Sequence, residues 1–162
     1  MNAYNKLFAR LDTKTRQPIL EKVRNSHSAR QHILLVDDDT LFCKVTSDAL
    51  SEAGFEVSIV SDGNCALSLI SSQPGKFDLI ILDRMMPELS GIEVLGKLSA
   101  QKLKSNIPVI MLTSYAGKSQ IEIASQYGVT ETIFKTIGNA DLINVVNRTL
   151  KNKEINFSLI VD

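Results

Sequence analysis

Carboxylates gather where two short apolar runs of the sequence end. Three aspartates, Asp37–Asp39, directly follow the run Ile33–Val36, and Asp83 directly follows Leu79–Leu82. Neighbouring carboxylates repel each other by roughly 4 kcal/mol at about 4 Å and an effective dielectric constant of about 20. The aspartates could cap a following helix, but capping uses one carboxylate and leaves Asp83 unexplained. A divalent cation explains the group better, because Mg²⁺ binds one or two carboxylates together with water and phosphate oxygens.

A hydroxyl group and a cation follow two further runs of this kind. Thr113 comes after Val109–Leu112, and Lys135 comes after residues 130–134. Thr113 could simply cap a helix, and Lys135 could be an ordinary surface lysine. Alternatively, the hydroxyl of Thr113 donates to a phosphoryl oxygen, and Lys135 pairs with Asp83 or with a phosphoryl oxygen. With a divalent cation these groups suit phosphoryl transfer, which needs an in-line nucleophile and neutralised charge more than acid–base groups.

These side chains are positioned by an alternation of apolar runs and amphipathic segments that begins at residue 32. The runs predict five strands, over residues 33–36, 55–60, 79–82, 109–112 and 130–134. The segments between and after them predict helices, over residues 39–53, 65–71, 91–100, 120–127 and 141–150. Apolar strands separated by amphipathic helices favour an α/β fold with a parallel sheet that is covered on both faces. Right-handed crossovers make this sheet doubly wound, with its ligand site at the carboxyl ends of the strands.

Helical spacing also predicts which faces of two helices are buried. In the first helix, Asp39 is the expected N-cap. Apolar residues then recur at helical spacing in that helix, at Phe42, Val45, Ala49 and Ala53. In the last helix, the residues on one side are Leu142, Val145, Val146 and Thr149. We expect these two sets to face the sheet.

Three segments give the chain a specific family resemblance. They read Ile-Leu-Leu-Val-Asp-Asp-Asp, then Asp-Leu-Ile-Ile-Leu-Asp-Arg-Met-Met-Pro-Glu-Leu-Ser-Gly, then Ile-Pro-Val-Ile-Met-Leu-Thr-Ser. Together with Lys135, their order and spacing resemble those of response-regulator receiver domains over residues 32–152. The resemblance implies a flavodoxin-like fold, a five-stranded parallel sheet of strand order 2-1-3-4-5.

The resemblance also implies roles for single residues. Asp37 and Asp38 match the acidic pair that holds Mg²⁺, directly or through water. Asp83 matches the aspartate that attacks a phosphohistidine and becomes an acyl phosphate. Met85 matches the position whose backbone carbonyl completes the metal shell, so the implied metal ligands are Asp37, Asp38, Asp83 and Met85.

The remaining positions match groups around the phosphoryl site. Thr113 matches the switch hydroxyl, and Lys135 matches the cation that contacts the phosphoryl group. Pro87 and Gly91 match the loop after the acceptor. Two positions depart from the family pattern: Thr136 stands where a proline usually follows the lysine, and Thr132 stands where an aromatic switch residue is usual.

The function implied is that of a two-component response-regulator receiver that catalyses only its own phosphorylation and dephosphorylation. Its expected partner is a sensor histidine kinase or a phosphotransfer protein in the cytoplasm. The departures at Thr132 and Thr136 leave an alternative, a pseudo-receiver that acts as a non-phosphorylated interaction module. A nucleotide- or flavin-binding enzyme on the same fold is disfavoured, because the first turn carries aspartates rather than the glycines that approach phosphates.

The ends of the chain lie outside the receiver pattern. Residues 1–31 carry seven basic and two acidic side chains, and a helical stripe is formed by Tyr4, Leu7, Phe8 and Leu11. We expect a basic helical extension that packs on this domain or mediates a homodimer, as the last helix face also could. Residues 153–162 end in a strand-like pattern, read as a tail or as the first strand of a following domain. We expect neither a membrane nor a nucleic-acid partner, since no apolar run is long enough to span a bilayer and no helix-turn-helix segment remains outside the receiver.

Overall fold

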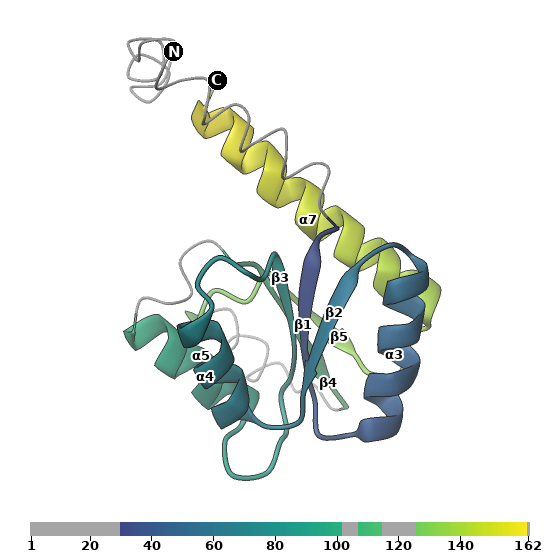
Figure 1. Cartoon of the computed structure of the whole chain (residues 1–162), viewed down its shortest axis with the longest axis vertical. Coiled ribbons are helices and arrows are strands. Elements are labelled where there is room, and N and C mark those ends of the chain that lie inside the picture. Colours follow the sequence, from purple (N-terminus) through teal and green to yellow (C-terminus); the bar gives the residue numbers. More distant parts are fainter. Residues whose placement is uncertain (1–29, 102–106, 115–125, 162) are drawn as a thin grey trace.

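A five-stranded sheet with helices on both sides forms the body of the protein (Figure 1). The computed structural model describes residues 30–101, 107–114 and 126–161, and only the backbone over 154–161. The strands are β1 His32–Val36, β2 Glu56–Val60, β3 Leu79–Asp83, β4 Val109–Thr113 and β5 Glu131–Phe134. The helices in this part of the chain are α3 Thr40–Glu52, α4 Gly63–Ser72, α5 Gly91–Ala100 and α7 Asn139–Val161.

The sheet is parallel throughout, with the strand order β2-β1-β3-β4-β5. This confirms the doubly wound architecture that the sequence pattern predicts and the strand order that the resemblance implies. The register pairs Val36 of β1 with Leu82 of β3, and the residue that follows each of them in the sequence is an aspartate of the expected site. The sheet therefore brings Asp37 and Asp83 together although they are far apart in sequence.

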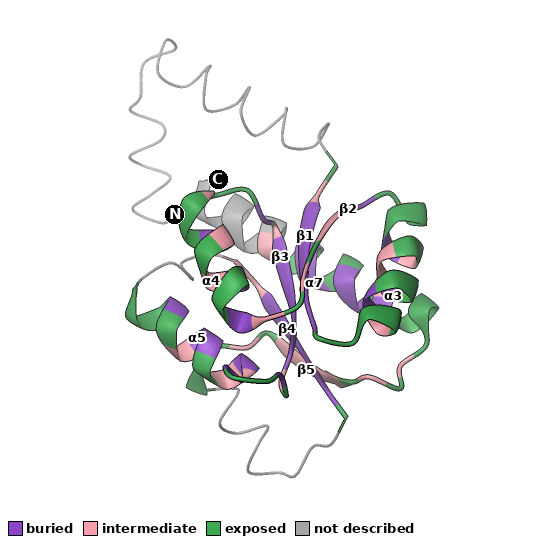
Figure 2. Ribbon diagram, turned by 60° about the horizontal axis from the view of Figure 1, so that its bottom comes forward, coloured by how far each residue is buried: buried purple, intermediate pink, exposed green. Residues whose placement is uncertain are grey.

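Each central strand is buried on both faces, as its unbroken apolar sequence predicts (Figure 2). Alternate residues point to opposite sides of a strand. Leu34 and Val36 of β1 accordingly join the core under α4 and α5, whereas Ile33 and Leu35 join the core under α3 and α7. The two apolar layers fix the sheet between its helices, and only the strand ends are left for polar side chains.

Helix α3 begins where predicted but buries a different face. The Asp39 carboxylate caps it by accepting from the N–H groups of Leu41 at 3.0 Å and Phe42 at 2.9 Å. The face toward the sheet is formed by Cys43, Thr46 and Leu50. The predicted Val45 is 48% exposed, Ala53 is exposed, and Phe42 and Ala49 are half-buried. The prediction followed apolarity alone and missed that small residues such as Cys43 and Thr46 allow close packing on β1 and β2.

Helix α7 is longer than the sequence pattern indicates. Its predicted inner face is confirmed, because Leu142, Val145, Val146 and Thr149 are all buried. The helix then continues to Val161, so of the two readings of residues 153–162, a tail or a strand, the strand is wrong. No proline or glycine interrupts residues 139–161, and the apolar residues near the end suit a helix as well as a strand. The assignment of domain boundaries, including a domain after residue 152, stays a prediction.

Two other expectations fall on segments that the structure does not describe. The helical extension before residue 30 and most of the predicted helix 120–127 lie outside the described residues. In the part of the chain that is described, no helix has both the length and the apolar character that a membrane span requires.

The first residue of α5 has no room for a side chain, which gives a test of the packing below the site. A Cβ at Gly91 would collide with the backbone oxygen of Asp83. We expect Gly91→Ala to lower the free energy of unfolding by roughly 1–3 kcal/mol, the usual cost of overpacking. Gly96→Ala in the same helix is the control, because its Cβ would meet only Tyr127 at 3.7 Å. That control should be neutral or stabilise by up to about 1 kcal/mol in chemical denaturation, and equal effects of the two variants would contradict the prediction.

Candidate functional site

Three carboxylates meet where β1 and β3 end. One oxygen from each of Asp37, Asp38 and Asp83 lies within 4.8 Å of the others. Asp37 is 1% exposed and Asp83 is 2% exposed, whereas Asp38 lies at the surface. Burial and mutual repulsion both oppose the ionised forms, so the cluster needs positive charge beside it.

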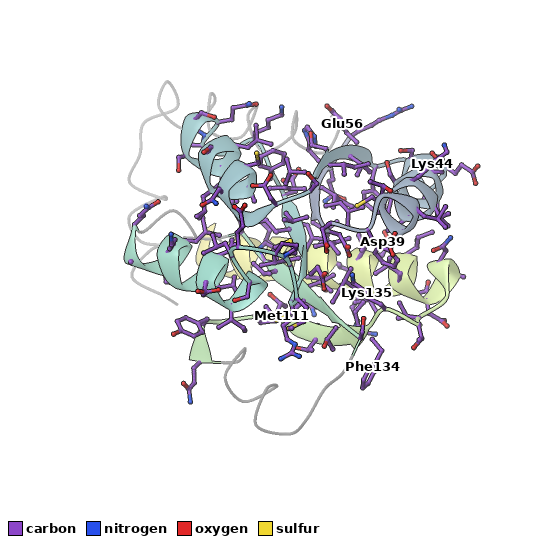
Figure 3. The ribbon with its side chains drawn as sticks, turned by 90° about the horizontal axis from the view of Figure 1, so that it is seen from below. Asp39, Lys44, Glu56, Met111, Phe134 and Lys135 are labelled. Atoms are coloured by element: carbon purple, nitrogen blue, oxygen red, sulfur yellow. The ribbon has the colours of Figure 1, made fainter. Side chains whose placement is uncertain are left out.

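Lys135, which directly follows the edge strand β5, supplies part of that charge. Its Nζ donates to Asp37 Oδ1 at 2.9 Å and lies 2.9 Å from Asp83 Oδ2. The backbone N–H of Lys135 donates to the carbonyl of Thr113 at 2.9 Å, which continues the pairing of β4 with β5. Figure 3, viewed onto this edge, shows Lys135 lying among the strand ends near Asp39. The structure thus contains the pair of Lys135 with Asp83 that the sequence offered as one alternative.

One lysine does not balance the cluster. Three carboxylates against one ammonium group leave a net negative charge on the site. Lys135 Nζ also lies 2.8 Å from the buried Asp37 Oδ2, so the lysine is shared among the Asp37 and Asp83 carboxylates. Three carboxylates that share one cation and offer oxygens within 4.8 Å of one another fit the oxygen ligands of Mg²⁺.

The surroundings shift the proton affinity of the two central groups. Burial raises the pKa of Asp83 and the Asp37 charge adds to this, while the hydrogen bond from Lys135 acts in the opposite direction. For Lys135, burial works against the charged form, but the hydrogen bonds to Asp37 and Asp83 outweigh it and raise the pKa above its ordinary value. The lysine therefore keeps its positive charge, whereas the surroundings of Asp83 disfavour its ionised form.

The loop after β3 contacts Asp83 Oδ1, the carboxylate oxygen that does not face Lys135. The N–H of Met85 donates to Asp83 Oδ1 at 3.3 Å, and the N–H of Gly91 donates to Arg84 O at 3.0 Å. The side chain of Met85 is 63% exposed. The loop thus brings the Met85 backbone against the acceptor, and the metal-binding role of its carbonyl stays a prediction.

Thr113 ends β4 and is buried, with 1% of its surface exposed. Its carbonyl contacts the Lys135 backbone, so the two residues lie beside each other at the strand ends. Thr132 is half-buried in β5, Thr136 is exposed, and Phe134 is 52% exposed. In Figure 3, Phe134 lies toward the rim of this edge. The switch role of the Thr113 hydroxyl stays a prediction.

Sequence reasoning missed two contacts made by the first turn of α3. The Cys43 thiol donates to the carbonyl of Asp37 at 3.3 Å. Burial, followed by the Asp37 charge, raises the pKa of this thiol to about 11, so it remains a neutral donor. The Phe42 ring centroid lies 5.3 Å from Lys135 Nζ, within the range of a cation–π contact. The sequence signal that could have indicated these contacts is position, because both residues fall in the turn that follows the aspartates.

Comparison with known proteins gives a family match over most of the chain. Residues 33–147 match the family described as the response regulator receiver domain. The two-component response regulator ORR5 of Oryza sativa subsp. japonica is 31% identical over 120 residues, which cover 74% of this chain and 89% of that protein. The DNA-binding response regulator MtrA of Mycolicibacterium smegmatis is 30% identical over 125 residues, which cover 77% of this chain and 53% of that protein.

Solved structures agree with these sequence matches. A response regulator receiver domain protein (CheY-like) from Methanospirillum hungatei JF-1 has a TM-score of 0.72 at 29% identity, and the match covers 79% of this chain and 99% of that one. The chemotaxis protein CheY4 of Vibrio cholerae has a TM-score of 0.70 at 28% identity, and the match covers 75% of this chain and 99% of that one.

The raised pKa of Asp83 makes a prediction about stability. Folding favours the protonated carboxyl, so ionised Asp83 destabilises the folded protein. In metal-free buffer at pH 7, Asp83→Asn should therefore raise the free energy of unfolding by on the order of 1 kcal/mol. The gain should shrink as pH falls through the folded pKa and vanish below the unfolded pKa of an aspartate.

Denaturant titrations over a range of pH would measure this gain. Asp48→Asn in α3 is the matched control, because the Asp48 side chain is 64% exposed, and we expect almost no change there. A loss of stability in Asp83→Asn at neutral pH would contradict the electrostatic description of the site.

Proposed function

This chain belongs to the response-regulator receiver domain family, and we propose that it accepts a phosphoryl group on Asp83 in two-component signalling. The observation that carries the proposal is the position of Asp83, buried beside Asp37 and in contact with Lys135 at 2.9 Å. A carboxylate kept out of water and lightly stabilised is a ready nucleophile. A lysine already in contact with it can remain on the phosphoryl group after transfer.

In the proposed reaction, a carboxylate oxygen of Asp83 attacks the phosphorus of a phosphohistidine. A P–O bond forms as the P–N bond breaks, and the electron pair returns to the imidazole nitrogen of the donor. Asp83 becomes an acyl phosphate, and Lys135 balances charge on the phosphoryl oxygens. We assign Thr113 as the hydroxyl donor to one of these oxygens.

Mg²⁺ is the cofactor that we propose for the reaction. Asp37, Asp38 and Asp83 would hold it, with the carbonyl of Met85 as a further ligand. When bound, the cation would add positive charge to that of Lys135 and would stabilise the charge on the phosphoryl oxygens. The negative charge that Lys135 alone leaves on the three carboxylates supports this assignment.

The proposed phosphodonor is a sensor histidine kinase or a phosphotransfer protein. We place this exchange in the cytoplasm, and the two free cysteines, Cys43 and Cys65, are consistent with a reducing compartment. We further propose that output passes through a protein partner or through self-association.

Label transfer tests the acceptor directly. The full chain should take up phosphate from a small radiolabelled phosphodonor when Mg²⁺ is present, and a chelator should abolish the uptake. We expect Asp83→Asn to lose incorporation, whereas the exposed control Asp48→Asn should label like wild type. Undiminished labelling of Asp83→Asn would overturn the assignment. A wild-type protein that neither labels nor binds beryllofluoride with Mg²⁺ would instead favour the pseudo-receiver.

Substitution of Lys135 separates its role from that of the metal. Lys135→Met removes the protein's cation at the phosphoryl site, and we expect the labelling rate to fall by about a hundredfold. Mg²⁺ binding, measured by calorimetry, should remain because the three carboxylates remain. Lys44→Met is the matched control, since that lysine is 73% exposed and pairs only with Asp48 among the described residues. Equal labelling rates for the two variants would contradict a role for Lys135 in transfer.

A further inference from the structure

The first turn of α3 lies against the acidic site and carries Phe42. The Phe42 N–H donates to Asp39 Oδ1 at 2.9 Å, and the neighbouring Cys43 thiol donates to the carbonyl of Asp37 at 3.3 Å. Figure 3 shows Asp39, which caps this turn, near Lys135. The Phe42 side chain is half-buried and packs against the apolar core under α3 and α7. The cap, the thiol and the core therefore hold this turn and its ring independently of Lys135.

Lys135 brings its ammonium group to this ring on a long side chain. Its Nζ lies over the Phe42 ring, 5.3 Å from the ring centroid, which is within the range of a cation–π attraction. The same nitrogen contacts Asp37 Oδ1 at 2.9 Å and Asp83 Oδ2 at 2.9 Å. Although burial opposes the charged form, the hydrogen bonds to these two carboxylates raise the pKa of Lys135, so the ring faces an ammonium group.

The ring is the partner of Lys135 that the proposed reaction leaves unchanged. Transfer converts the Asp83 carboxylate into an acyl phosphate, so that carboxylate no longer forms the same ion pair with the lysine. Asp37 is a proposed ligand of the cation, which would weaken its attraction for the lysine. The Phe42 ring is neutral and takes part in neither change. Its attraction for the ammonium group is therefore available before and after transfer.

We propose that Phe42 positions Lys135 for phosphoryl transfer by holding its ammonium group at the strand ends, an inference that rests on the acceptor role proposed for Asp83. The ring restricts a flexible side chain to the place where the phosphoryl oxygens arrive, so less order has to be gained during the reaction. No proton, electron pair or covalent bond passes to the ring. Phe42 is a positioning residue that acts through Lys135, and its effect depends on an aromatic face rather than on apolar bulk.

The contact itself can be measured without phosphorylation. In proton–carbon NMR spectra of the full chain, the ring should shift the ε-methylene signals of Lys135 upfield, and Lys135→Met identifies these signals by their loss. Phe42→Leu should remove the shift, and Phe42→Tyr should keep it. Phe134→Leu is the matched control and should leave the shift in place. Phe134 directly precedes Lys135, but in the described part of the chain no cation lies over its ring.

Label transfer then measures the consequence of losing the contact. With a small radiolabelled phosphodonor and Mg²⁺, Phe42→Leu should label about fivefold more slowly than wild type, the effect of removing one cation–π contact. Phe42→Tyr and Phe134→Leu should label like wild type. In the Lys135→Met background, adding Phe42→Leu should slow labelling no further, because the ammonium group on which the ring acts is gone. Mg²⁺ binding, measured by calorimetry, should be unchanged in Phe42→Leu.

Equal labelling rates for Phe42→Leu and wild type overturn the positioning role. A loss of rate that Phe42→Tyr shares, or one that persists in the Lys135→Met background, also overturns it, since either result assigns the effect to packing. An unshifted Lys135 signal in wild type overturns the contact. A wild-type chain that takes up no label instead contradicts the acceptor role of Asp83, and the NMR result distinguishes that failure from a failure of the contact.

Discussion

The structure of the site depends on one electrostatic constraint, the burial of like charges at the end of a parallel sheet. Asp37 and Asp83 are almost fully buried and Asp38 lies beside them, with Lys135 as the neighbouring cation. Such a cluster costs stability in the resting protein. A divalent cation would restore the charge balance, because three carboxylates and one ammonium group leave two negative charges on the site.

The rest of the fold holds that constraint in place. The two apolar cores fix the register in which Val36 pairs with Leu82, and this register sets the two buried aspartates beside each other. Gly91 lets α5 begin directly against the Asp83 backbone, where a larger residue would not fit. Packing on both faces of the sheet therefore holds the aspartates together against their electrostatic repulsion.

Much of this arrangement could be predicted from the sequence, because short-range patterns determine it. Apolar runs ending in aspartate, threonine or lysine predicted the strands and the convergence of the site, and the family resemblance implied the strand order. Predictions failed where the physical signal was ambiguous. The buried face of α3 was misplaced because Cys43 and Thr46 pack closely without being strongly apolar. The end of α7 has a strand-like pattern yet is helical, because its apolar residues suit either structure. The contact of the Phe42 ring with Lys135 depends on tertiary packing that no local pattern encodes.

The central claim is that the phosphoryl group is carried by the carboxylate of Asp83. Borohydride reduction of the phosphorylated chain followed by peptide mass spectrometry tests it most directly, because hydride reduces an acyl phosphate to an alcohol and releases phosphate. This account predicts homoserine at position 83, formed only after phosphorylation in the presence of Mg²⁺. Homoserine at another aspartate, or phosphate retained on a hydroxyl or imidazole group, would contradict it.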